Sequence, residues 1–416
     1  MGLAEVPLLL ALVGMAAYVV LGGADFGAGL WYLLLPGERR RPLRDHTYHA
    51  MGPVWEANHV WLIFVLVVVW TAYPRAFGAI FSTLYVPLFA AALGIIIRGA
   101  CYALRSAVST PREERILGAL FGASSMLTPF ALGAAIGGIA SGRVPLGNAA
   151  GDPVDSWLNA TSMTIGVLSV ATSAYLAAVW LTGDAARAGR SDLADAFRIR
   201  ALVTAAVAGA IALGGLVVLH GDADRIYDGL TSGSGLVALF ASVVAGAATA
   251  LLVARRRPEP ARWSAAVAVA AIVAGWALAQ RPEILPGLTV AEAAAGDATL
   301  VALLVSIAIG SAILIPSLAL LFSLVLRGRF DEPPDAIGSL ERAARRPVAT
   351  ATAVGEPGRA LGAAAAVCAV LGVPLTFFSD AGATLVLGVV LLLAAVAAGI
   401  AFVVPRAAVS SMEDGS

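Results

Sequence analysis

Three ionisable side chains lie within two apolar stretches near the N-terminus. Glu56 and His59 stand at the start of the apolar run 52–72, and Asp25 lies inside the preceding run 7–34. Residues three apart share a helix face, so Glu56 and His59 point the same way. Ionisable groups at membrane depth are energetically costly and by default functional. Two acids and a histidine in neighbouring apolar helices therefore indicate a path for protons.

Each of these residues also has a purely structural interpretation. Asp25 lies among the glycines of Gly22–Gly29, which suit close helix contact, and its carboxyl could bond a neighbouring backbone group. Glu56 lies near a helix start, where an acid complements the helix dipole. Trp55 and Trp61, which flank it, are typical interfacial anchors. We favour function for both acids, because acids are rare inside membranes.

The composition is that of a polytopic membrane protein. Of 416 residues, 59% are hydrophobic and 13% charged, and the mean hydropathy is +0.87, which is too apolar for a soluble domain. The net charge is zero and the basic residues cluster in short loops, so nucleic-acid binding is not expected. Cys101 and Cys368 have no second Cys or His at metal-ligand spacing, so neither a structural disulfide nor a thiolate metal site is expected.

Apolar runs of about 18 residues or more predict membrane-spanning helices. The eleven runs are 7–34, 52–72, 76–97, 116–140, 160–181, 201–220, 234–254, 263–279, 299–326, 361–378 and 383–405. We predict an all-α polytopic membrane protein, with about nine core transmembrane helices in residues 1–326 and a C-terminal two-helix hairpin. Residues 327–359 are predicted to be a cytoplasmic linker, and residues 360–416 an additional transmembrane hairpin with a short cytoplasmic tail.

The arginines predict the orientation, because basic loops stay on the cytoplasmic side. All but four of the 27 basic residues lie in the loops after the first, third, fifth, seventh and ninth runs or in the C-terminal tail. The four exceptions, Arg75, Arg143, Arg225 and Arg281, lie in the alternate loops, which carry many of the acids. The N-terminus is therefore expected outside and the C-terminus in the cytoplasm.

This orientation places the polar groups in the cytoplasmic half of the membrane. At 1.5 Å per residue, Asp25 lies about 15 Å from the cytoplasmic face, and Glu56 and His59 lie roughly 6 to 10 Å from it. Arg98 and Arg105, at the inner end of the third run, are candidate partners that could hold an acid ionised. The polar chemistry is thus expected within the first helical bundle.

The histidines argue against a haem or a metal in this chain alone. Haem needs axial ligands, usually His or Met, that face each other at membrane depth, and among the histidines only His59 clearly qualifies. Glu56 and His59 match the spacing of one half of a di-iron motif, but that site needs a second such pair and further glutamates on facing helices. We therefore expect no bound cofactor and no metal here.

Several segments carry a family resemblance: Gly22–Gly29 (GGADFGAG), Gly52–Leu62 (GPVWEANHVWL), Tyr73-Pro74, Phe81–Tyr85 (FSTLY) and Arg98. With them the sequence resembles subunit II of the cytochrome bd quinol oxidases. The resemblance is specific over residues 15–105 and extends by helix pattern, with Asp297 and Pro316 in place, to about residue 326.

The resemblance implies a nine-helix subunit of a bacterial inner-membrane complex that oxidises quinol and reduces oxygen to water. In this family haems b and d and the quinol-oxidation loop belong to the partner, subunit I, while subunit II stabilises the complex and contributes a proton route. Glu56 and Asp25 match family acids. Gly22 replaces the first acid of the family's Asp-Gly-Phe-Asp pattern, and His59 stands where Glu or Gln is more common. The hairpin 360–405 is an addition to the family pattern.

Two hypotheses follow. The first is a non-haem subunit of a terminal oxidase with a cytoplasm-facing proton path through Asp25, Glu56 and His59, and with Trp55, Asn58, Trp61, Arg98 and Arg105 as candidates for structural or partner contacts. The second is a proton-coupled secondary transporter that uses the two acids as coupling sites. A transporter would more typically show polar breaks in corresponding helices of two repeats, and the second half of this chain is nearly without intramembrane charge. We favour the oxidase subunit.

Overall fold

The computed structural model describes residues 2–35, 42–44, 46, 47, 55–104 and 110–326, together with isolated positions between 363 and 398. The chain divides into two compact units, Met1–Leu314 and Ile315–Ser416, which are considered separately. The described part is almost entirely helical, which confirms the predicted all-α class. The linker 327–359 lies outside the described residues, as does most of the C-terminal hairpin.

The elements follow one another along the membrane domain in a simple order. They are η1 (Leu3–Glu5), α1 (Val6–Leu34), α3 (Trp55–Ala72), α4 (Pro74–Thr83), α5 (Tyr85–Leu104), α6 (Pro111–Ala140), α7 (Ala160–Arg187), α8 (Ser191–Asp222), α9 (Asp224–Thr231), α10 (Gly233–Ala254), α11 (Pro258–Gln280), β1 (Glu283–Leu285), β2 (Leu288–Thr289), α12 (Val290–Ala293) and α13 (Asp297–Leu326).

Eight of the described helices are long and apolar enough to cross a membrane: α1, α5, α6, α7, α8, α10, α11 and α13. The chain is thus a multi-pass membrane protein. Helix α3 has 18 residues, and at 1.5 Å per residue it reaches about 27 Å, close to the thickness of the hydrocarbon core. With α3 the predicted core count of about nine is reached.

The predicted third run, 76–97, is not one helix. Helix α4 ends at Thr83, Leu84 leaves helical geometry with φ −98° and ψ 25°, and α5 begins at Tyr85. The reason is Pro87, because a proline removes an N–H and its ring clashes with the carbonyl four residues earlier, here that of Thr83. The helix that crosses the membrane is therefore Tyr85–Leu104.

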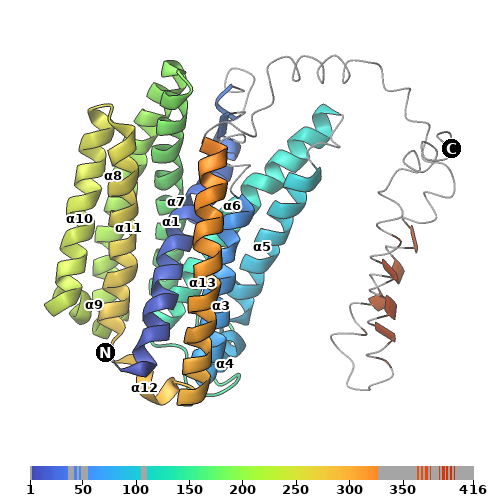
Figure 1. Ribbon diagram of the computed structural model, residues 1–416, viewed down its shortest axis with the longest axis vertical. Coiled ribbons are helices and arrows are strands. Elements are labelled where there is room, and N and C mark those ends of the chain that lie inside the picture. Colours follow the sequence, from blue (N-terminus) through green and yellow to red (C-terminus); the bar gives the residue numbers. More distant parts are fainter. Residues whose placement is uncertain are drawn as a thin grey trace. The chain divides into compact units, whose positions relative to one another are not determined.

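Helix α7 lies at the centre of the first unit and packs against α8, α6, α1 and α11. In Figure 1, α8, α10 and α11 (green to yellow) stand together beyond α7, while α3, α5 and α6 (blue to cyan) lie on the other side of α1. Small residues allow this packing: a Cβ atom added to Gly27 of α1 would overlap the carbonyl oxygen of Ser173 in α7. Trp31 stabilises the same contact, because its Nε1–H donates a hydrogen bond to the carbonyl of Ala174 at 2.9 Å.

The segments between the long helices are fastened by polar contacts at one end of the bundle. Strands β1 and β2 pair antiparallel, with Glu283 opposite Thr289. Arg281 binds Glu5 at 2.7 Å, which ties the start of this hairpin to the N-terminus. The backbone N–H of Ala295 donates to the carbonyl of Ala72 at 2.7 Å. These contacts hold the short elements against α1 and α3.

Candidate functional site

A fully buried ion pair joins α1 to α5. Nη2 of Arg98 lies 2.7 Å from Oδ1 of Asp25, and neither side chain is exposed. The same nitrogen donates to the Asp25 carbonyl at 2.8 Å, and Nη1 donates to the hydroxyl of Ser125 on α6. Arg98 is thus the cation that contacts the intramembrane acid. Arg105, the other candidate partner, lies outside the described residues.

Aromatic rings enclose the guanidinium. The Arg98 Cζ atom lies 4.3 Å from the ring centroid of Phe121 and 5.4 Å from those of Phe26 and Tyr102. Aromatic faces attract cations, and most strongly where water is excluded. Gly29 supplies the room, because a Cβ atom there would overlap the Ser125 hydroxyl and lie 2.5 Å from Nη1 of Arg98. A buried charge is tolerated only when it is paired and hydrogen-bonded, and this site meets both conditions.

Helix α3 brings two further polar side chains to α1. Asn58 is buried, and its Nδ2 atom donates to the carbonyl of Leu21 at 3.3 Å. The His59 ring lies beside two aromatic rings of α1, with centroid distances of 6.0 Å to Tyr18 and 5.8 Å to Phe26. Phe26 follows Asp25 directly in α1, so His59 lies beside the segment that holds the acid. The structure therefore brings Asp25, His59, Asn58 and Arg98 into one neighbourhood.

The remaining candidates of α3 are placed less completely. Glu56 occupies the first turn of α3, and its side chain and that of Trp55 lie outside the described part of the structure. Trp61 is half-buried, and its ring meets that of Phe64 edge-on at 6.4 Å between centroids. The roles of these residues stay predictions.

The sequence interpretation missed two contributors to this site. Ser125, which receives Nη1 of Arg98, has a hydroxyl of a common residue type and gives no signal by itself. Tyr18 does give a signal, because it is the only residue from Val6 to Leu21 with a polar side-chain group, and it precedes Asp25 by two helical turns. Phe26 links them, with its ring edge-on to that of Tyr18 at 6.4 Å.

The comparisons with known proteins identify the family. The family model described as "Cytochrome bd terminal oxidase subunit II" matches residues 3–325. The chain belongs to this family. Its members are membrane subunits of haem-containing oxidoreductase complexes, so this subunit works with a partner subunit. The resemblance found in the sequence is thereby confirmed.

Individual relatives agree with this assignment. A chain of Bacillus subtilis provisionally named cytochrome bd menaquinol oxidase subunit II is 24% identical over 56% of this chain and 67% of its own length. A cytochrome bd-I ubiquinol oxidase subunit 2 of Escherichia coli is 26% identical over 32% of this chain and only 35% of its own length. The structure of bd oxidase from Geobacillus thermodenitrificans matches 80% of this subunit and all of its own chain, with 26% identity and a TM-score of 0.61.

The described histidines are not arranged as a pair of haem ligands. His59 lies beside the rings of Tyr18 and Phe26, His46 lies against the Leu181 carbonyl at 3.4 Å, and His220 lies against another ring. No two imidazoles of the described part face each other as a pair of axial ligands would. Within those same ranges, no three His, Cys, Asp or Glu side chains gather as metal ligands do.

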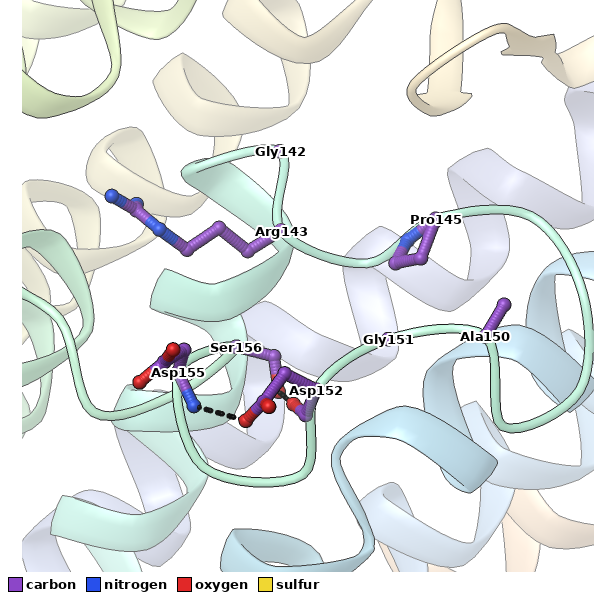
Figure 2. Close-up of a pocket in the computed structure, with 8 residues that line it drawn as sticks. All are labelled: Gly142, Arg143, Pro145, Ala150, Gly151, Asp152, Asp155 and Ser156. Atoms are coloured by element: carbon purple, nitrogen blue, oxygen red, sulfur yellow. Dashed lines mark hydrogen bonds between the residues drawn. The ribbon is translucent and has the colours of Figure 1, made fainter.

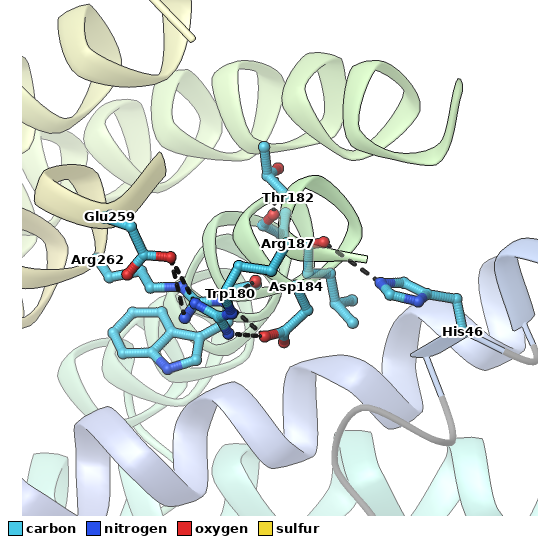
Figure 3. A network of polar contacts seen from close by, with 9 residues as sticks. His46, Trp180, Thr182, Asp184, Arg187, Glu259 and Arg262 are labelled. Carbon is cyan, nitrogen blue, oxygen red and sulfur yellow. Dashed lines mark hydrogen bonds and ion pairs between the residues drawn. The ribbon is translucent and has the colours of Figure 1, made fainter. Parts of the chain in front are cut away.

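A second polar network joins the C-terminal end of α7 to the start of α11 (Figure 3). Nη2 of Arg262 binds Oδ1 of Asp184 at 2.7 Å and also donates to the carbonyl of Trp180 at 2.7 Å. Arg187 binds both Asp184 and Glu259. These ion pairs join the end of α7 to the start of α11, so the network holds the two helices together.

The loop between α6 and α7 forms a pocket of about 350 Å³ at the opposite helix ends (Figure 2). Asp152 in its wall accepts hydrogen bonds from the backbone of Asp155 at 2.8 Å and Val154 at 2.7 Å, and these donors hold the pKa of its carboxyl below the ordinary value. Arg143, also in the wall, is paired with Asp222 at 2.6 Å. The charges of this pocket thus stabilise the loop itself.

Proposed function

We propose that this chain is the non-haem subunit of a bacterial bd-type quinol:oxygen oxidoreductase, in which it supports the haem-bearing subunit I and contributes a cytoplasm-facing proton path. Haems b and d belong to the partner, and quinol and oxygen are substrates of the complex. The family match supports the first part. The observation that carries the second is the cluster of buried polar groups around α1, in which Arg98 of α5 pairs with Asp25 and Asn58 of α3 bonds the Leu21 carbonyl.

The complex needs such a path because reducing one oxygen molecule to two waters consumes four protons. A site within lipid receives protons only through titratable groups or ordered water. In this proposal Glu56 accepts protons on the cytoplasmic side and His59, three residues later on the same face, is the next station. Asp25 is a neighbouring station: its Oδ1 atom is held by Arg98, whereas its Oδ2 atom has no hydrogen-bond partner in the described structure.

The direction of the path follows the predicted orientation. The subunit is proposed to lie in the bacterial plasma membrane with its N-terminus outside and its C-terminus in the cytoplasm. The arginines of the network between α7 and α11 support this, because basic residues collect on the cytoplasmic side. In this orientation the start of α3, where Glu56 lies, is proposed to face the same side. Residues 327–359 are proposed as the cytoplasmic linker to the added hairpin in 360–416.

The transporter hypothesis is not favoured. The family model covers residues 3–325, which include every candidate proton station. A secondary transporter would more typically carry polar breaks in corresponding helices of its two halves. In this subunit the buried charged pair of the described helix interiors joins α1 to α5, in the first half of the membrane domain.

Glu56→Gln tests the proposed path. The variant keeps the shape and much of the hydrogen bonding of the side chain but removes its titration, so quinol-driven oxygen consumption by the purified complex should fall by about 10²-fold or more. Assembly with the partner subunit and the haem spectrum should persist, and Glu56→Asp should retain more activity. Glu259→Gln removes an acid from the network at the helix ends and should leave turnover unchanged. A wild-type rate for Glu56→Gln in a fully assembled complex would favour the helix-start interpretation instead.

A further inference from the structure

One polar side chain at the interface of α1 and α3, that of Tyr18, is not a station of the proposed proton path. Tyr18 is 7% exposed, and its hydroxyl has no hydrogen-bond partner among the described residues. The rest of the stretch from Val6 to Leu21 is apolar. Buried polar groups are as a rule hydrogen-bonded, to protein or to ordered water. The hydroxyl of Tyr18 is therefore suited to bind water within this interface.

Gly22 determines where the Tyr18 ring lies. A Cβ atom added to Gly22 would stand 3.1 and 3.2 Å from the Cε2 and Cδ2 atoms of that ring. The ring thus lies against α1 one turn after its own backbone. Its centroid is 6.4 Å from that of Phe26, although residues eight apart are separated by about 12 Å along a helix axis. The two rings lean toward each other, so Tyr18 is directed toward the segment that holds Asp25.

Tyr18 also lies beside His59. Leu21 of α1 pairs with Asn58 of α3, and further along the interface Gly14 meets the ring of Phe64, so the two helices run antiparallel. Between these levels the rings of Tyr18 and His59 lie 6.0 Å apart. Past Tyr18, the contact of Gly14 with Phe64 is apolar.

We propose that Tyr18 is a proton-relay residue next to His59, an inference that rests on the proposed proton path. Its oxygen accepts the excess proton of a protonated water on the side of His59 and Asp25, while its own hydroxyl proton passes to a water on the far side, which then carries the excess proton. The phenol ends neutral, one proton has moved by one hydrogen-bond length on each side, and no electron is transferred. Among the described residues, Asp25 and Arg98 are charged groups that act on Tyr18.

Tyr18→Phe tests the relay in the purified complex with its partner subunit, because it removes the hydroxyl and keeps the ring over Gly22. Quinol-driven turnover should fall by about tenfold. This loss is smaller than the roughly 10²–10⁴-fold contribution typical of a residue that transfers protons, because water can partly replace the hydroxyl. The ratio of rates in H2O and D2O should rise, since proton transfer becomes slower than the other steps. Tyr175→Phe is the matched control: Tyr175 lies on α7 and is 6% exposed, and neither readout should change.

Gly22→Ala is a second variant that leaves the hydroxyl in place. Its Cβ atom crowds the Tyr18 ring, so turnover should fall in the wild-type background, but not further when combined with Tyr18→Phe. Lower turnover of Tyr18→Phe with an unchanged isotope ratio would show a structural role and overturn the relay. Wild-type turnover of Tyr18→Phe beside a slow Glu56→Gln would overturn the relay and leave the path standing. Wild-type turnover of both would overturn the path and the relay with it.

Discussion

The ion pair of Asp25 and Arg98 yields the sharpest prediction for stability. Both side chains are fully buried. Arg98 donates hydrogen bonds to the Asp25 carboxylate at 2.7 Å, to the Asp25 carbonyl at 2.8 Å and to the Ser125 hydroxyl. Removing one partner leaves an uncompensated buried charge, which typically costs about 3–5 kcal/mol. Asp25→Asn and Arg98→Met should each destabilise the subunit by about that amount.

The double variant discriminates between a coupled pair and two independent contributions. With both charges gone, no buried charge remains to be compensated, and Met fills much of the volume between the aromatic rings. The double variant should therefore be at least about 2 kcal/mol more stable than the sum of the two single losses implies. If the losses add, the two residues do not stabilise each other and the geometry has been misinterpreted.

The assay is the apparent Tm of the detergent-solubilised complex at one fixed scan rate, because large membrane complexes unfold irreversibly. Each single variant should lower the Tm by several degrees, and the double variant should recover part of that loss. Asp195→Asn is a suitable control: Asp195 pairs with Arg256 at 3.2 Å, but both side chains are substantially exposed. Such surface pairs contribute about 0–1 kcal/mol, so the control should keep the wild-type Tm.

Three further predictions concern packing, the C-terminal segment and haem. Gly27→Ala should lower the Tm of the complex because its Cβ atom would overlap the Ser173 carbonyl, whereas Gly209→Ala, which has open space, should not; equal Tm values would contradict the close packing. Deletion of 340–416 should leave quinol oxidation largely intact, and loss of the partner subunit on truncation would instead place the hairpin in the assembly interface. The chain expressed alone should bind no haem, and a stoichiometric Soret band would contradict this.

Much of the helical architecture could be predicted from the sequence, because long apolar runs leave few alternatives in a membrane. The break at Leu84 could also have been predicted, since Pro87 forbids the helical bond to Thr83, but the continuous apolar run concealed it. Helix α9 and the β1–β2 pair were missed, because such short segments carry no strong periodicity and depend on contacts such as that between Arg281 and Glu5.

The candidate site was predictable in kind but not in detail. An acid at membrane depth requires a cation, so the sequence pointed to Arg98 or Arg105 as a partner for an acid. It could not assign Arg98 to Asp25, because that depends on the rotation and depth of α5 against α1. Tyr18 escaped notice for a related reason: one hydroxyl among apolar residues does not change the hydropathy of a helix, and its significance appears only when α3 is packed against it.

The glycines of Gly22–Gly29 show why packing and function were wrongly set against each other as alternatives. Gly27 lets α1 meet the backbone of α7, which is a packing role. Gly29 makes room for the Arg98 guanidinium, and Gly22 makes room for the Tyr18 ring. Because a helix turns by about 100° per residue, Gly22 and Gly29 lie on one face of α1, about 20° apart, whereas Gly27 lies about 140° from Gly22. The same run of small residues therefore fixes the helix on one side and admits polar groups on another, so substitutions a few residues apart should separate loss of stability from loss of proton transfer.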